Sequence, residues 1–290
     1  MKANHFRCGR ELIWRFRHMD GSKLKSQLIA QAKGGSISEL LNWHKDYCEY
    51  NREERNLAAI FYHLLLINDN LAEFLSMIDY DKPTLVDEVG IYFEYSNLRD
   101  IWFNLNSNEI KRRIILSLLA PQNLKELEEL SVLEFNTHFG AVPTPSTNYI
   151  QNPGNWSIKK YKNNITNNEE FLKATKFKWA FNVKPDIVIH TTKRTAICIE
   201  CKYQSGEGSY PTDIEEIQEF RRRGLDQVQQ TSLQKYMMED LLGIDTQFIY
   251  LIQKYNAASN THQSLYWKQV FAKLDLSGCP QFIRQCIARI

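Results

Sequence analysis

The segment KPDIVIHTTKRTAICIECK, residues 184–202, decides the fold expected for this chain of 290 residues. Apolar and polar side chains alternate through the segment, a pattern typical of strands with one buried face. The pattern predicts strands over residues 186–191 and 195–203, joined by a loop at 192–194. A hairpin with this loop pairs residue 189 with residue 197, so it places Asp186 opposite Glu200.

This register brings two carboxylates and one lysine onto a single face of the predicted hairpin. Side chains alternate between faces along a strand, so Asp186 shares its face with Glu200 and Lys202. Opposed like charges destabilise a strand pair unless they are neutralised, and a divalent cation is the simplest neutraliser. Mg²⁺ or Mn²⁺ can take one or two carboxylates and keep waters for substrate phosphates. The pattern therefore predicts a metal site at which Lys202 orients or deprotonates an attacking water.

The same residues resemble the signature of the PD-(D/E)xK nuclease superfamily, which includes many restriction endonucleases and repair nucleases. Pro185-Asp186 is followed, after thirteen residues, by Glu200-Cys201-Lys202. The resemblance covers roughly residues 169–255. It implies an α/β (α+β) fold with a restriction-endonuclease-like core, ordered helix-strand-strand-strand-helix-strand, whose mixed sheet is flanked by helices. It also implies that Asp186, Glu200 and the backbone carbonyl of Cys201 bind the metal and that Lys202 is the catalytic lysine.

The resemblance suggests a further carboxylate, because many members carry a glutamate on the first core helix. Glu54, in the segment EERNLAA at residues 53–59, is the expected residue, although it lies 132 positions before Asp186. Glu169 and Glu170 are the alternatives, since they begin a helical stretch directly before the strands. Either pair of acids would also suit an exposed helix start, where the helix dipole favours negative charge.

A glutamine is expected as well, because many members place one, or a glutamine and a tyrosine, on the helix after the third strand. Gln227, Gln230 and Gln234 recur on one predicted helix face, and Tyr236 follows them. Gln230 is the expected site residue. The spacing from Gln230 to Tyr236 departs from the family's usual Gln-x-x-x-Tyr, so the choice among the three glutamines stays open.

The chain divides into three regions by composition. Residues 1–135 are predicted to be mainly helical, and the stretch at about 52–67 is a candidate for the first core helix. Residues 136–168 are rich in Asn, Thr, Pro, Gly and Ser and are predicted to form a loop or linker. Residues 169–290 are predicted to hold the nuclease core and C-terminal helices. Within them, further strands are expected at 178–183 and 247–253, with a helical stretch at 213–242 between the last two strands.

Composition limits the class of protein and the compartment. The formal charge is only +2, with 36 Lys and Arg against 34 Asp and Glu, which excludes a histone-like chain or an acidic linker. Six cysteines are too few for a disulfide scaffold of this length, which favours a reducing cytoplasm. The apolar runs fall short of the roughly 18 residues of a membrane span, so no membrane partner is expected. Cys198 and Cys201 should point to opposite strand faces, which argues against a zinc site.

Local charge points to a nucleic-acid partner. Residues 159–194 contain nine Lys or Arg and three acids, interleaved with aromatic residues, and Arg221–Arg223 adds to the basic count. The predicted function is therefore a Mg²⁺-dependent endo- or exonuclease that hydrolyses phosphodiester bonds, with DNA favoured over RNA. By family analogy it would serve restriction or phage defence, with a homodimer as one arrangement. The alternative is a catalytically silent nucleic-acid-binding or protein-interaction module with the same fold.

Overall fold

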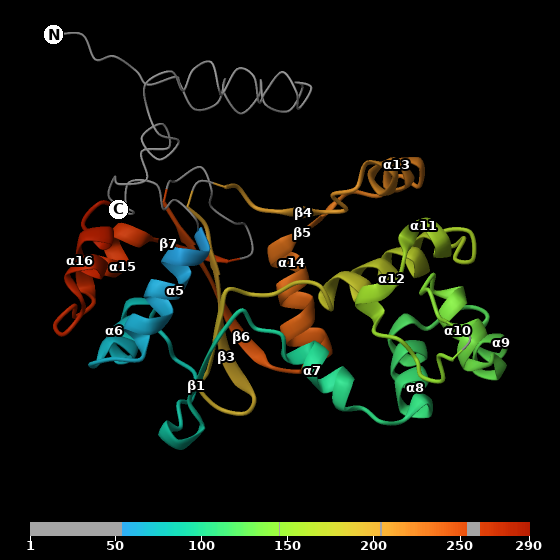
Figure 1. The fold of residues 1–290 in the computed structure, drawn as a ribbon, viewed down its shortest axis with the longest axis horizontal. Helices are drawn as coiled ribbons and strands as arrows, with labels where there is room; N and C mark the ends of the chain where they lie inside the picture. The colour runs from blue at the N-terminus through green and yellow to red at the C-terminus, as the bar shows by residue number, and fades with distance from the viewer. Residues whose placement is uncertain (1–53, 145, 204, 254–261) are drawn as a thin grey trace, which may run out of the picture. The chain divides into compact units, whose positions relative to one another are not determined.

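Residues 184–202 form the centre of a five-stranded mixed sheet in the computed structural model, which describes residues 54–144, 146–203, 205–253 and 262–290 (Figure 1). The strands, in their order across the sheet, are β1 Gly90–Phe93, β2 Ile187–His190, β3 Thr195–Cys201, β6 Asp245–Ile252 and β7 Gln263–Tyr266. Strands β1, β2 and β3 are antiparallel, whereas β6 runs parallel to β3 and to β7. The sheet is mixed, as expected.

The predicted hairpin register is confirmed. Ile187 pairs with Ile199, Ile189 with Ile197 and His190 with Ala196, so the same register continued by one residue sets Asp186 opposite Glu200. The strand faces alternate as expected. The odd-numbered apolar residues of β2 and β3 pack in one core. The even-numbered apolar residues pack in the other core, on the same sheet face as Glu200. Cys198 and Cys201 accordingly lie in different cores.

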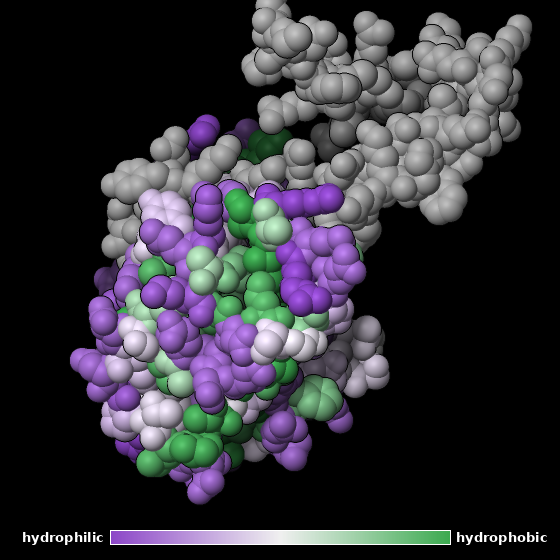
Figure 2. All heavy atoms as spheres, turned by 90° about the vertical axis from the view of Figure 1, so that its left-hand side faces the viewer, coloured by the Kyte–Doolittle hydropathy of each residue, from purple (hydrophilic) through white to green (hydrophobic). Residues whose placement is uncertain are grey.

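Four helices cover one face of the sheet (Figure 1). They are α5 Glu54–Leu65, α6 Asn70–Met77, α15 Trp267–Lys273 and α16 Gln281–Ile287. Helix α5 buries Leu57, Ala58 and Phe61 at helical spacing against the isoleucines of β2 and β3. This burial of one helix face agrees with the amphipathic pattern of the segment at 52–67. The outer surface of this layer is largely hydrophilic, with a broken band of hydrophobic side chains (Figure 2).

The other face carries the remaining helices and a small second sheet (Figure 1). The helices are α7 Asn97–Asn104, α8 Asn108–Leu119, α9 Leu124–Glu129, α10 Val132–His138, α11 Ile158–Tyr161, α12 Asn168–Ala180, α13 Ile214–Arg222 and α14 Gln230–Lys235. Short strands β4 Ser209–Tyr210 and β5 Val228–Gln229 pair beside α14, and a π-helical turn at Tyr236–Leu241 follows it. Single 3₁₀ turns lie at Val86–Glu88 and Pro153–Asn155.

Two expected elements are wrong. The strand expected at 178–183 is instead the last turn of α12 and the buried bend after it. Helix α12 buries residues around much of its circumference, so its apolar residues show no clear helical period. The helical stretch expected at 213–242 is interrupted at β5, because residue Gly224 ends α13 with a positive φ of 67°.

Residues before and after the predicted linker share the same cores. Tyr95, Trp102 and Phe135 pack in one cluster with Phe177 and Val188, and residues 54–290 belong to one compact unit. Within the described part of 136–168, α11 and a 3₁₀ turn pack onto α12 and α13 rather than forming an open loop. Residues 1–53 of the predicted helical region lie outside the described residues. No helix in the described ranges is long and apolar enough to cross a membrane.

Candidate active site

Asp186 and Lys202 are fixed by backbone contacts at the end of the hairpin. The residues that follow β1 hold the start of β2: the Glu94 amide donates to the carbonyl of Asp186 over 2.8 Å, and the Tyr95 amide donates to Pro185 over 3.0 Å. Asp186 Oδ2 accepts the amide of Cys201 at 2.7 Å. The acid is therefore tied across the strand pair to the segment that carries Glu200 and Lys202.

Lys202 directly follows β3 and is held from two sides. Its amide donates to the carbonyl of Leu251 over 2.7 Å, and its own carbonyl accepts the indole N–H of the buried Trp267 at 2.9 Å. These bonds connect the lysine to β6 and to the start of α15. The side chain is thereby directed to the Glu200 side of the sheet, as strand alternation requires.

Glu200 is buried and accepts hydrogen bonds from three side chains. Its Oε1 accepts from Lys202 Nζ at 2.7 Å and from Gln230 Nε2 at 2.7 Å, and its Oε2 accepts from Gln234 Nε2. Helix α14 supplies both glutamines at i and i+4, which is one helix face. Gln227 lies before the helix and donates to the carbonyl of Pro211, so it is not part of the cluster.

Glu54 joins the cluster from the other layer of helices. It is the first residue of α5, and its Oε1 lies 3.1 Å from Lys202 Nζ. Its Oε2 accepts the Tyr203 amide at 3.2 Å and the Ser205 hydroxyl. The structure thus brings Glu54 next to a lysine 148 residues away.

The alternative glutamates have other partners. Both lie in the first turn of α12, where the side chain of Asn167 caps the helix by accepting their amides. Glu169 pairs with Lys173 at 2.8 Å, and Glu170 accepts the amide of Gln122 at 2.8 Å. They form an exposed helix start of the ordinary kind.

Burial controls the protonation of the cluster. Burial and the neighbouring Glu200 raise the pKa of Asp186 to about 8, despite the hydrogen bond from Cys201. Burial also raises the pKa of Glu200, although Lys202 opposes the shift. Burial would lower the pKa of Lys202, but Glu200 and Glu54 outweigh it, so the pKa of the lysine is raised. Lys202 is therefore held as an ammonium by its two carboxylate partners.

The donor set fits a hard cation with few protein ligands. Among the residues that the structure describes, no group of three or more His, Cys, Asp or Glu is arranged to hold a metal ion. Asp186 and Glu200 remain as an opposed pair, which matches the one or two carboxylates that Mg²⁺ commonly takes. The buried carboxylate of Glu200 already accepts from Lys202 and from two side-chain amides. A cation would therefore have to displace some of these donors from Glu200.

Sequence patterns missed several contacts of the cluster. Gln230 was the expected residue, and Gln234 was an open alternative that the structure also brings to Glu200. The buried His262 lies 3.3 Å from Gln234 Oε1 through its Nε2. Tyr250 pairs with Glu200 across β3 and β6 and is buried, and its hydroxyl has no hydrogen-bond partner within the described residues. No local spacing could have indicated these contacts, since β6 and β7 approach the site only in the folded sheet.

The basic segment differs from its expected role. The aromatic residues interleaved with it are buried in the core and cannot stack on bases: Trp156, Tyr161, Phe171, Phe177, Trp179 and Phe181. Lys159 pairs with Asp213 and Glu215, at 3.1 and 2.9 Å. Arg223 stacks on the Phe171 ring at 3.9 Å and bonds Glu219, so it joins α13 to α12. Part of the local positive charge is therefore used within the fold.

Comparisons with protein-family models, with curated proteins and with solved structures found no match to this chain.

Proposed function

We propose that this protein is a metal-dependent nuclease of the PD-(D/E)xK kind, acting on the phosphodiester bonds of nucleic acid. The observation that carries the proposal is the convergence of Asp186, Glu200 and Lys202 with Glu54 into one largely buried charged cluster. Buried charges cost several kcal/mol of desolvation each, so such a cluster is a poor way to stabilise a fold. Strongly shifted pKa values, such as that of Asp186, concentrate at functional sites.

The order of elements supports the same proposal. Helix α5, strands β1, β2 and β3, helix α14 and strand β6 follow one another in the order expected for a restriction-endonuclease-like core. The segment between β1 and β2 separates the helix that carries Glu54 from the hairpin that carries Asp186. This segment accounts for the wide spacing of the two acids in the sequence.

The residues of the cluster divide the chemistry among them. Asp186, Glu200 and the backbone carbonyl of Cys201 would hold Mg²⁺ or Mn²⁺, which when bound supplies Lewis acidity and lowers the pKa of water. Lys202 carries a fixed positive charge that stabilises the negative charge developing on the phosphate. Glu54 orients the lysine through their 3.1 Å contact, and Gln230 and Gln234 orient Glu200.

Cleavage by matched variants tests the proposal. The purified full chain, given Mg²⁺ or Mn²⁺, should cut at least one member of a panel of single- and double-stranded DNA and RNA. Asp186→Asn, Glu200→Gln and Lys202→Met should each lower the rate by at least about a hundredfold, because each removes a ligand or a charge needed at the phosphate. Glu169→Gln is the matched control and should cut like the wild type. Equal cutting by all variants would rule out the assignment.

One observation favours the second candidate, a silent binding module with this fold. Lys202 already pairs with both Glu200 and Glu54, so the cluster has a cationic partner without a metal ion. A silent module predicts nucleic-acid or protein binding that EDTA does not change, and no heat of Mn²⁺ binding by calorimetry. Mn²⁺ binding that Asp186→Asn abolishes would favour the nuclease.

We also propose DNA as the preferred substrate and the cytoplasm as the compartment. Within the described ranges, Cys198, Cys201 and Cys279 are free and buried, which suits a reducing environment. DNA rests on the family resemblance alone, so the DNA and RNA arms of the cleavage panel decide this point.

A further inference from the structure

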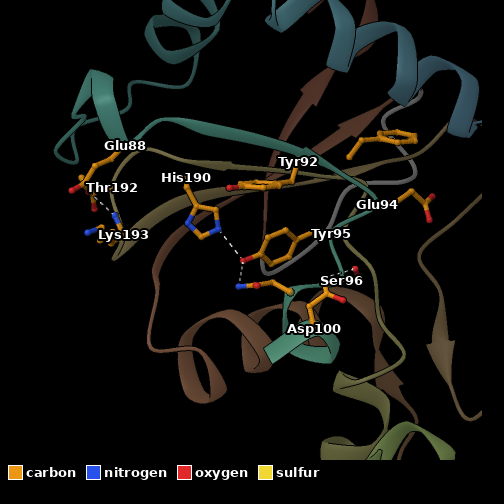
Figure 3. Close-up of a pocket in the computed structure, with 11 residues that line it drawn as sticks. Glu88, Tyr92, Glu94, Tyr95, Ser96, Asp100, His190, Thr192 and Lys193 are labelled. Carbon is orange, nitrogen blue, oxygen red and sulfur yellow. Dashed lines mark hydrogen bonds between the residues drawn. The ribbon is translucent and has the colours of Figure 1, made fainter. Parts of the chain in front are cut away.

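A cavity of about 390 Å³ opens beside the edge strand β1, away from the charged cluster (Figure 3). Its walls come from β1, the end of β2, the hairpin loop and the start of α7. Its lining includes Phe93 and three further aromatic residues, Tyr92, Tyr95 and His190, which lie together in the close-up. None of the residues proposed for the nuclease reaction lines this cavity.

The fold holds the ring of Tyr92 in place while leaving half of it in solvent. The residue is 50% exposed, yet its ring folds back over Gly90, where an added Cβ would come within 2.9 Å of the ring and its hydroxyl. The ring meets His190 edge-on, with centroids 5.6 Å apart at 88°. An exposed aromatic face fixed in this way can stack a flat ligand with little loss of side-chain entropy.

The floor of the cavity is a short hydrogen-bonded chain. The buried Tyr95 hydroxyl accepts from Asn97 Nδ2 at 2.9 Å and lies 2.8 Å from His190 Nε2 (Figure 3). Burial lowers the pKa of His190, so the ring is neutral near pH 7. Its Nε2 then accepts a hydrogen bond from the Tyr95 hydroxyl. These bonds fix the floor before any ligand enters.

The rim is rich in hydrogen-bond acceptors. Asp100 and Glu88 both line it, and Lys193 is the cation among the lining residues. Glu94 pairs with Arg55 at 3.0 Å. Glu88 and Asp100 each use one carboxylate oxygen within the rim, which accepts the Lys193 amide at 2.9 Å and the Ser96 hydroxyl at 3.3 Å, respectively. Carboxylates repel phosphate but accept hydrogen bonds from N–H groups, so the entering group should be a flat ring with amino hydrogens. Adenine, guanine and cytosine carry an exocyclic amine, whereas thymine and uracil do not.

The cavity lies on the same sheet face as the charged cluster. His190 and Asp186 share one face of the strand that begins the hairpin and are four residues apart, or about 13 Å at roughly 3.3 Å per residue. A strand of nucleic acid with one phosphate at Glu200 and Lys202 could therefore place a base a few nucleotides away in the cavity.

We propose that this cavity binds an unstacked, amino-bearing nucleobase. The inference rests on the proposed function in taking the substrate strand as one source of the base, and a free nucleoside is the other source. Aromatic stacking with hydrogen bonds to the base edge is the usual way in which proteins bind single-stranded bases.

Binding in EDTA tests the cavity without any cleavage. The full chain should bind labelled single-stranded oligo-dC or oligo-dA about tenfold more tightly than oligo-dT of equal length, as measured by fluorescence anisotropy. Tyr92→Ala and Asp100→Asn should remove this preference. Gly90→Ala should weaken it too, because the added methyl displaces the Tyr92 ring without deleting it. Phe103→Ala removes an 83% exposed ring of α7 outside the cavity and should leave the preference unchanged.

Competition separates the two sources of the base. Release of the labelled strand by free cytidine or adenosine, but not by thymidine, would show that the cavity takes a free nucleoside as well. A preference seen only with oligonucleotides would assign the cavity to the strand. Equal binding of the three oligonucleotides, no binding at all, or a preference that survives in both Tyr92→Ala and Gly90→Ala would overturn the proposal. Because no metal is present, this result is independent of whether the protein cuts nucleic acid.

Discussion

Two buried tyrosines differ in the hydrogen bonding of their hydroxyl groups. Tyr95 makes two hydrogen bonds through its hydroxyl, to His190 and Asn97. Tyr250 has none among the described residues, although it lies beside Glu200 in the sheet. A buried hydroxyl without a hydrogen bond costs about 1–3 kcal/mol, so its removal should not lower stability.

Replacing each tyrosine separately by phenylalanine should therefore change the free energy of unfolding in opposite directions. Tyr250→Phe should raise the metal-free free energy of unfolding by about 1 kcal/mol, because it removes an unpaired polar group. Tyr95→Phe should lower it by about 1–2 kcal/mol, because His190 and Asn97 lose their partner. Urea unfolding in EDTA measures both. Destabilisation by Tyr250→Phe as large as that by Tyr95→Phe would contradict the unpaired state of its hydroxyl.

Asp186 should make the metal-free protein sensitive to pH. Its folded pKa is about 8, well above that of an unfolded aspartate, so the folded state keeps the proton that the unfolded state has lost. This contribution to stability is complete below about pH 4 and is lost as the pH rises through 8. In EDTA, the wild-type Tm should fall between pH 5.5 and 8.5 by more than that of Asp186→Asn. Parallel Tm profiles of the two proteins would show that Asp186 has no raised pKa.

At the scale of elements, local sequence was enough to predict the hairpin with its register, but only some of the other elements. The register of β2 and β3 follows from a loop of fixed length and from alternation, both of which are encoded within residues 184–202. The helix expected at about 52–67 and the strand expected at 247–253 also followed from periodicity, and they correspond to α5 and β6. The four-residue strand β1 gave no such signal, because it is too short to show a period and exists by pairing with β2.

Helix α13 shows why a run of basic residues does not by itself indicate a nucleic-acid site. Arg223 and Glu219 are both largely buried and bonded at 2.6 Å, and burial of Arg223 on Phe171 adds a cation–π contact. The hydrogen bonds from Arg222 and Arg223 overcome burial and lower the pKa of Glu219 to about 2. Arg221, in contrast, is exposed.

Arg223→Ala should therefore destabilise the fold by about 2–4 kcal/mol, because it leaves Glu219 with one arginine and removes a buried contact. Arg221→Ala should change stability by less than about 0.5 kcal/mol. Chemical denaturation of the two variants compares them directly. Equal stability of both variants would contradict the structural role of Arg223.

At the scale of the whole molecule, distant parts of the chain build the candidate site. Asp186, Glu200 and Lys202 could be predicted as one cluster because they lie in one hairpin. The place of Glu54 depends on α5 packing across the sheet, and the resemblance, not the spacing, pointed to it. His262, Trp267 and Tyr250 reach the cluster only because β6, β7 and α15 close the sheet. Contacts of this kind leave no local pattern in a sequence.

The net charge of +2 likewise conceals an uneven distribution. Some acids and bases of the segment at 159–223 pair with each other within the fold, as Lys159 and Arg223 do, whereas the cluster at the end of β3 keeps buried charge of both signs. It is this buried charge, more than any basic surface, that supports a reaction at phosphate.

The measurement that tests this account most directly compares the wild type with Glu200→Gln in one cleavage assay with Mn²⁺. The glutamine keeps the size of the side chain and one acceptor oxygen but removes the buried charge. The account predicts nucleic-acid products from the wild type that EDTA abolishes, and a loss of at least about a hundredfold in Glu200→Gln while its fold is retained. Products formed equally by both proteins, or formed in EDTA, would contradict it.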